Sequence, residues 1–95
     1  MSVLIDPPVW PAHGRLWAHL ASDESFDELH AFARRVGVPE RAFERDHYDV
    51  PAERHAALVA AGATPVRARD LVRRLSEAGL RRPKGRPPPV PPTRE

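Results

Sequence analysis

Proline is distributed along this chain in a way that limits how much of it can fold. Six of the 12 prolines lie between Pro83 and Glu95, where Val90 is the one apolar side chain. Such a segment cannot bury enough apolar surface to offset the entropy lost on ordering. We therefore predict a disordered, polyproline-II-biased tail over residues 81–95. The single globular domain is expected over residues 1–80, enough chain for one modest core.

Composition excludes several classes of protein. The chain has no Cys, which rules out a disulfide scaffold and a thiolate zinc site. No apolar run approaches the roughly 18 residues that would span a bilayer. The first ten residues lack the basic start and long apolar stretch of a signal peptide. These features predict a cytoplasmic protein with no membrane partner.

Positive charge is concentrated in the last third of the sequence. From Arg67 onward there are 9 basic and 3 acidic residues, whereas residues 1–66 carry 6 basic and 10 acidic ones. A basic helix face running into a basic tail attracts phosphate backbones without reading bases. The alternative is a solvated helix face with a solubilising tail. The candidate nucleic-acid-binding residues are Arg67, Arg69, Arg73, Arg74, Arg81, Arg82, Lys84 and Arg86.

Hydrophobic spacing and helix caps predict the elements. A β-branched run over residues 2–5 reads as a buried strand, and Ser25 begins a capping box whose Glu28 reaches back to the Ser25 amide. Pro11 and Gly14 predict a loop over residues 9–15, and the segment 16–20 fits a short strand or a helical turn. A strand is further predicted over residues 43–50, a brief extended piece over 63–66, and helices over 26–36, 51–61 (with Pro51 as first helical residue) and 68–78. This alternation indicates an α/β or α+β fold, a small single-layer sheet of three to four short strands with three helices packed on it.

Potential chemistry is concentrated in the segment 46–49. Residues two apart on a strand share a face, so His47 and Asp49 are predicted to point one way, and Asp46 and Tyr48 the other. An imidazole beside a carboxylate can be oriented for proton transfer, or both can bind one divalent metal ion. The alternative is a satisfied pair that stabilises a strand end.

Other polar residues extend this candidate site. Asp6 and His19 are predicted at strand ends, where they can converge with His47 and Asp49 on one rim. His30 lies at the margin of the apolar stripe of its helix, so it faces either a cleft or solvent. No Gly-rich phosphate loop, nucleophile elbow or His-Glu-x-x-His pattern occurs, which sets aside the corresponding chemistries.

The chain resembles the bacterial and bacteriophage family called domain of unknown function 4031. The resemblance covers about residues 2–78 and leaves out the tail. One departure is Val50–Pro51, where the family is expected to have a Ser/Thr-Pro helix cap. The resemblance rests on Asp6, His19–Leu20 followed by Ala21 and Asp23, residues 27–33 with Gly37, His47–Tyr48–Asp49, Arg54, Ala56 and Gly62–Ala63.

What the resemblance implies is a polar site and no defined activity. The family's motif emphasises Asp6, His19, His30, His47 and Asp49, which favours a functional site and adds His30 to it. The leading hypothesis is a small domain that uses this site for metal-dependent or acid–base hydrolysis of a phosphoester. Candidate metal ligands are His47, Asp49, Asp6 and His19. The alternative is a noncatalytic module that binds nucleic acid or protein through the basic third helix and tail.

Overall fold

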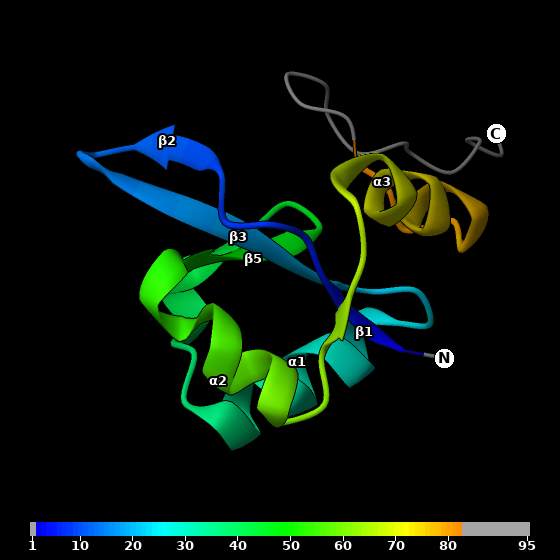
Figure 1. Ribbon diagram of the computed structural model, residues 1–95. Helices are drawn as coiled ribbons and strands as arrows, with labels where there is room; N and C mark the ends of the chain where they lie inside the picture. Colours follow the sequence, from blue (N-terminus) through cyan, green and yellow to red (C-terminus); the bar gives the residue numbers. More distant parts are fainter. Residues whose placement is uncertain (1, 83–95) are drawn as a thin grey trace, which may run out of the picture.

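The computed structural model describes residues 2–82 and shows an α+β fold, with one sheet covered by helices on both faces (Figure 1). The predicted tail lies outside the described residues, apart from Arg81 and Arg82. Among residues 2–82, no helix combines the length and apolar character needed to cross a membrane. The strands are β1 (Val3–Ile5), β2 (Trp10–Ala12), β3 (Arg15–Ser22), β4 (Phe43–Glu44), β5 (His47–Pro51) and β6 (Thr64–Pro65). The α-helices are α1 (Phe26–Val36), α2 (His55–Ala60) and α3 (Ala68–Glu77), and short 3-10 turns span Glu40–Ala42 and Ala52–Arg54.

The sheet is built around β3, its longest strand. On one side β3 pairs antiparallel with β5, and on the other side it pairs with β1 and β2 at successive positions. The order is β4-β5-β3-β1-β6, with β2 attached to β3 and β6 parallel to β1. The predicted α+β arrangement of three helices packed on one sheet is confirmed, but the prediction of three to four strands was wrong, because the sheet has six.

One missing strand was β2, where the sequence predicted a loop. β2 pairs with β3 through a hairpin whose turn residues, His13 and Gly14, have φ values of 53° and 75°. Two successive positive φ values are typical of the tight turn that matches strand twist. Pro11 is tolerated here because β2 pairs only with β3, so its missing N–H can face outward.

The predicted strand over residues 43–50 is in fact a hairpin. The chain turns at Arg45, whose φ is 58°, and at Asp46, so that β4 and β5 pair antiparallel. Pro51 ends β5 rather than beginning a helix, and a 3-10 turn precedes α2. The predicted helix over residues 51–61 is thus shorter and starts later.

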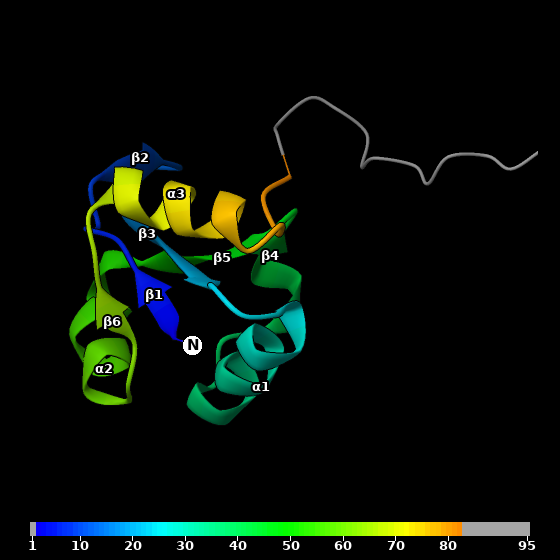
Figure 2. The same cartoon turned by 90° about the vertical axis from the view of Figure 1, so that its right-hand side faces the viewer.

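Strand alternation divides the apolar residues between two cores. Val3, Ile5 and Leu20 are among the residues that pack with α1 and α2, whereas Leu4 packs on the opposite face against Leu71 and Leu75 of α3. Figure 2 shows α3 on one side of the sheet and α1 and α2 on the other. The polar residues that alternate with the main core therefore face α3.

The predicted helix over residues 26–36 is confirmed as α1. Ser25 Oγ accepts from the Glu28 backbone N–H at 3.0 Å, and Gly37 ends the helix with a φ of 82°. Glu28 does not reach back to the Ser25 amide, because its carboxylate accepts from the buried Ser22 hydroxyl. Ser22 Oγ accepts in turn from the amides of Glu24 and Ser25. The end of β3 is thereby tied to the start of α1.

Candidate metal centre

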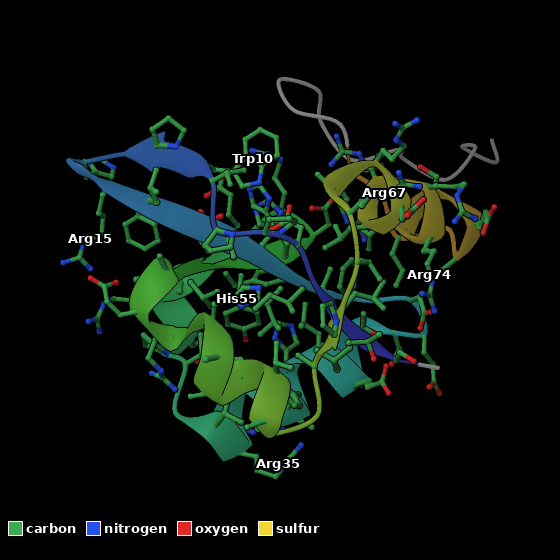
Figure 3. The ribbon with its side chains drawn as sticks, viewed as in Figure 1. Trp10, Arg15, Arg35, His55, Arg67 and Arg74 are labelled. Carbon is green, nitrogen blue, oxygen red and sulfur yellow. The ribbon has the colours of Figure 1, made fainter. Side chains whose placement is uncertain are left out.

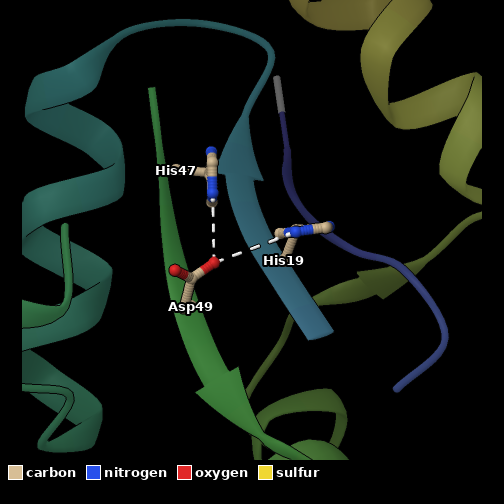
Figure 4. A group of neighbouring side chains, drawn as sticks. All are labelled: His19, His47 and Asp49. Carbon is tan, nitrogen blue, oxygen red and sulfur yellow. Dashed lines mark hydrogen bonds and ion pairs between the residues drawn. The ribbon is translucent and has the colours of Figure 1, made fainter. Parts of the chain in front are cut away.

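Two neighbouring strands place three potential metal ligands on the α3 face of the sheet. Tyr48 and Val50 of β5 enter the main core, so His47 and Asp49 point to the other face. His19 of β3 lies directly opposite Asp49 in the antiparallel register. Cross-strand partners share a face, and Figure 4 shows the three side chains together. Pairing of β3 with β5 thus brings together residues 28 to 30 positions apart in sequence.

The donor atoms of His19, His47 and Asp49 all lie within 4.8 Å of one another. Asp49 Oδ1 is 3.1 Å from His47 Nε2 and 3.8 Å from His19 Nε2. Two imidazole nitrogens and a carboxylate oxygen are a ligand set suited to zinc, iron and similar transition ions. The group could hold one such ion after small rotations of the side chains.

Asp6 contacts the Nδ1 side of the His19 ring and so fixes its orientation. Its Oδ2 is 2.8 Å from His19 Nδ1 and 3.0 Å from the indole nitrogen of Trp10, and its Oδ1 accepts from the His19 backbone N–H. The Asp6 side chain is only 1% exposed. Asp6 thus contacts the ring nitrogen that points away from Asp49, which leaves His19 Nε2 directed at the group. Asp6 therefore contacts the candidate ligand His19 and is not one of the three residues whose donor atoms lie together.

Asp46 does the same for His47, although the sequence predicted that it points the other way. Asp46 lies in the β4–β5 turn, before the alternation of β5 begins, and its Oδ1 is 2.8 Å from His47 Nδ1. Its Oδ2 accepts from the Arg82 backbone N–H at 2.7 Å and from Arg81 Nη1 at 3.4 Å. The side chain is fully buried. No spacing signal marks Asp46, because its position depends on the left-handed Arg45 before it.

Electrostatics concentrate charge on these groups. Burial opposes the charged form of His47, but the hydrogen bonds that its ring donates to Asp46 and Asp49 outweigh burial and raise the pKa of His47 to about 9. The hydrogen bond from His47 lowers the pKa of Asp49 against a smaller effect of burial. Burial also opposes ionisation of Asp46, yet His47 and the Arg82 amide hold its pKa below the usual value. All these shifts favour a charged site in the absence of an ion.

His30, which the family resemblance added to the site, lies elsewhere. It is on α1, and its Nδ1 is 2.6 Å from the Tyr48 hydroxyl on the main-core side of the sheet. Its ring also packs against Phe43 at a centroid distance of 4.8 Å. The structure therefore separates His30 from His19, His47 and Asp49 by the thickness of the sheet.

The basic residues of α3 are mostly engaged in ion pairs. Asp70 pairs with Arg67 and Arg73, and Asp23 pairs with Arg74. Arg81 is held by Asp46, and the Arg82 guanidinium lies 5.2 Å from the centre of the Phe26 ring. Lys84 and Arg86 lie outside the described residues. The predicted basic surface is thus partly neutralised within the described part of the chain.

Two hollows border the group formed by His19, His47 and Asp49, which is called the ligand group below. One, of about 400 Å³, lies between the sheet and α3 and is bordered by His47, Arg45, Arg69 and Arg81. The other, of about 670 Å³, extends along the β2–β3 hairpin and is bordered by Asp49. His19 and Trp10 border both hollows. The Asp49 side chain is 43% exposed, so the group is open to solvent and solutes.

Comparison with known proteins gives one match. The sequence model of the family described as protein of unknown function (DUF4031) matches residues 3–78, which include β1 to α3 and all five of the residues Asp6, His19, Asp46, His47 and Asp49. No curated protein and no solved structure matches the chain.

Proposed function

Because the chain belongs to the DUF4031 family, whose activity is not established, its function has to be argued from the site, and we propose a metal-dependent phosphoester hydrolase. The observation that carries the proposal is the repeated arrangement at the two histidines. Asp6 contacts Nδ1 of His19, Asp46 contacts Nδ1 of His47, and both Nε2 atoms face Asp49. Carboxylates behind histidines are typical of metal sites, where they fix the tautomer and raise ligand basicity.

This geometry favours a metal site over metal-free acid–base catalysis. Both nitrogens of His47 lie within hydrogen-bond distance of carboxylates, so neither is free to accept a proton from a water molecule beside a substrate. An ion between the Nε2 atoms and Asp49 would replace the proton held there. Three protein ligands would leave a further position for water, as in catalytic zinc sites.

A bound divalent ion would lower the pKa of its water to about 7 and polarise a phosphoryl oxygen. Hydrolysis would then join the hydroxide of that water to phosphorus and break the ester P–O bond, and the proton released by the water would pass through solvent to the leaving oxygen. His19, His47 and Asp49 hold the ion, and Asp6 and Asp46 orient the two imidazoles.

Phosphate is favoured by the arginines beside the ligands. Arg45, Arg69 and Arg81 border the smaller hollow, and the guanidinium is the side chain best matched to phosphate geometry. Arg45 holds a left-handed backbone conformation that is costly for a residue with a Cβ. Its charge lies close enough to Asp49 to contribute to lowering the pKa of that carboxyl.

The proposal is tested by titrating Zn²⁺, Mn²⁺ and Mg²⁺ into metal-stripped protein in a calorimeter. We expect one site, tighter for Zn²⁺ and Mn²⁺ than for Mg²⁺ because two ligands are nitrogens. His47→Gln and Asp49→Asn should abolish it, and His55→Gln, which changes a histidine of α2 outside the site, should not. Hydrolysis of bis(p-nitrophenyl) phosphate should then follow metal occupancy. Heat from none of the ions, or equal binding by His47→Gln, would overturn the proposal.

A further inference from the structure

The two tryptophans of the chain lie side by side next to the candidate metal centre. Trp10 of β2 is directly opposite Trp17 of β3 in the antiparallel register, so both indoles are on one face of the hairpin. Trp17 is two residues before His19 on the same strand, which places it on the face that carries the ligands. The Trp10 ring lies 5.1 Å from the His19 ring. In Figure 3, Trp10 is on the same side of the sheet as α3.

Both indoles are held by a hydrogen bond from the ring nitrogen, and both residues stay at least partly exposed. Trp10 Nε1 donates to Asp6 at 3.0 Å, and Trp17 Nε1 donates to the Ala12 carbonyl at 2.9 Å. The Trp10 residue remains 42% exposed and Trp17 is partly exposed. The Trp10 ring is therefore open to solvent beside His19 and Asp6, with Trp17 opposite it on the hairpin, an arrangement suited to stacking against a ligand. Because their orientation is already set, they would lose little entropy on stacking against a flat ligand.

Charge around the group suits an anionic chain. With a divalent ion bound and both imidazoles neutral, five positive charges (the ion, Arg45, Arg69 and Arg81) face four carboxylates, namely those of Asp6, Asp46, Asp49 and Glu44. The excess of one positive charge is joined by Arg15, whose guanidinium lies 5.7 Å from the centre of the Trp17 ring. Positive charge interleaved with aromatic faces is the combination that binds single-stranded nucleic acid.

The two hollows add a geometric argument. A phosphodiester carries one substituent on each side of its phosphorus, and the ligand group lies where the two hollows meet, with Asp49 bordering one, His47 the other and His19 both. A phosphate at the ion would therefore send one substituent along α3 and the other along the β2–β3 hairpin. Bases on the hairpin side would reach Trp10 and Trp17 only if they were unpaired.

We infer that the substrate is single-stranded nucleic acid, with bases stacked on Trp10 and Trp17 and the scissile phosphodiester at the ion. This inference rests on the proposed function for the cleavage step, whereas the binding step stands on the tryptophans and arginines. Binding should depend on salt, because several phosphates would be neutralised by arginine.

The test uses intrinsic tryptophan fluorescence of the full chain, because Trp10 and Trp17 are its only tryptophans. Metal-loaded protein is titrated with an eight-nucleotide thymidine strand, an eight-nucleotide uridine strand, the same DNA as a duplex, and thymidine monophosphate. We expect quenching and saturable binding with a single strand, and binding at least tenfold weaker with the duplex and the monophosphate. A preference between the two single strands assigns DNA or RNA as the substrate.

Matched variants distinguish stacking on the tryptophan rings from the hydrogen bond that Trp10 donates to Asp6. Trp10→Phe and Trp10→Leu both remove the indole N–H that contacts Asp6, but only Phe keeps an aromatic face; the same pair is made at Trp17. With the oligonucleotide labelled and followed by anisotropy, the Leu variants should lose about fivefold or more in affinity relative to the Phe variants, as expected for one base–aromatic contact. Equal affinity of the Phe and Leu variants, or duplex binding as tight as single-strand binding, would overturn the inference.

The two proposals fail separately. Metal binding without single-strand binding leaves the metal site standing and overturns the nucleic-acid substrate. Single-strand binding that needs the tryptophans, in protein that binds no ion, supports the stacking surface and overturns the hydrolase.

Discussion

Asp46 is fully buried, and its two carboxylate oxygens contact different parts of the chain. Oδ1 is 2.8 Å from His47 Nδ1, and Oδ2 accepts from the Arg82 backbone N–H. We expect Asp46→Asn to lower metal affinity by about 10- to 100-fold, since partners behind a ligand contribute that much. The measurement is calorimetric titration with Zn²⁺. Asp70→Asn on the α3 surface is the control, and unchanged affinity in Asp46→Asn would contradict the role of Asp46.

His47 gives the metal-free protein a defined pH dependence. Its pKa is raised to about 9 in the folded chain from the ordinary value of 6.5. A raised folded pKa contributes stability that is complete below the unfolded value and is lost as pH rises through the folded one. The thermal midpoint of the metal-stripped protein should therefore decrease as the pH is raised from 6.5 to 9.

Two comparisons check the origin of that fall. His47→Gln should show a flatter profile over the same range in parallel thermal melts. Metal-loaded protein should show the opposite slope at subsaturating Zn²⁺, because the ion binds only the deprotonated imidazole. A steep fall that persists in His47→Gln would assign the titration to another group.

At the level of single residues, alternation along a strand was enough to put His47 and Asp49 on one face. Alternation could not predict the direction of the Asp46 side chain, because Arg45 before it has a left-handed backbone conformation. That conformation belongs to the β4–β5 hairpin, for which the sequence has no recognisable signal. The sequence pattern also left the side of His30 open, because a residue at the margin of a helix stripe takes its partner from tertiary packing, here the Tyr48 hydroxyl.

Among the elements, the β2–β3 hairpin is the one whose turn is most sensitive to sequence. His13 and Gly14 have φ values of 53° and 75°. Gly14→Ala should lower the free energy of unfolding by about 1 kcal/mol, because a Cβ disfavours the left-handed region. His13→Asn should raise it by about 0.5 kcal/mol, since Asn-Gly is preferred in such turns. Urea unfolding checks both, and equal stability of the three proteins would contradict this turn geometry.

The elements differ in how far local sequence determined them. α1 carries its own start and stop in Ser25 and Gly37, so its prediction needed no tertiary information. β4 and β6 lie inside segments that were predicted to be extended, whereas β2 was predicted as a loop, because three residues are too few for a periodic signal. β2 exists because β3 offers it an unpaired edge, and pairing of that kind is not encoded in the short segment itself.

At the scale of the molecule, a bound ion would connect parts that are far apart in sequence. Its ligands come from β3 and β5, and their partners come from the end of β1 and the β4–β5 turn. A free ion concentration of about 100 times Kd should stabilise the fold by about 2.7 kcal/mol. For a domain of this size, that corresponds to a rise in Tm of roughly 10–20 °C. Thermal melts with Zn²⁺ check it, and His47→Gln should show no rise.

A pair of truncated chains tests the contact between the C-terminal region and the site. A chain ending at residue 80 loses both contacts to Asp46, whereas a chain ending at residue 82 keeps Arg81 Nη1 and the Arg82 amide. We expect the shorter chain to bind Zn²⁺ several-fold more weakly than the longer one, in titrations of both. Equal affinity would show that His47 is oriented without residues 81 and 82.

The Asp46 carboxylate thus contacts both His47, which would bind the ion, and the Arg82 backbone N–H in the segment after α3. Thermodynamic reciprocity requires that if release of Arg82 weakens the ion, loading of the ion must tighten Arg82 by the same factor. A partner that releases Arg82 from Asp46 would then lower the metal occupancy of the site. A higher metal concentration would in turn favour the contact between Arg82 and Asp46.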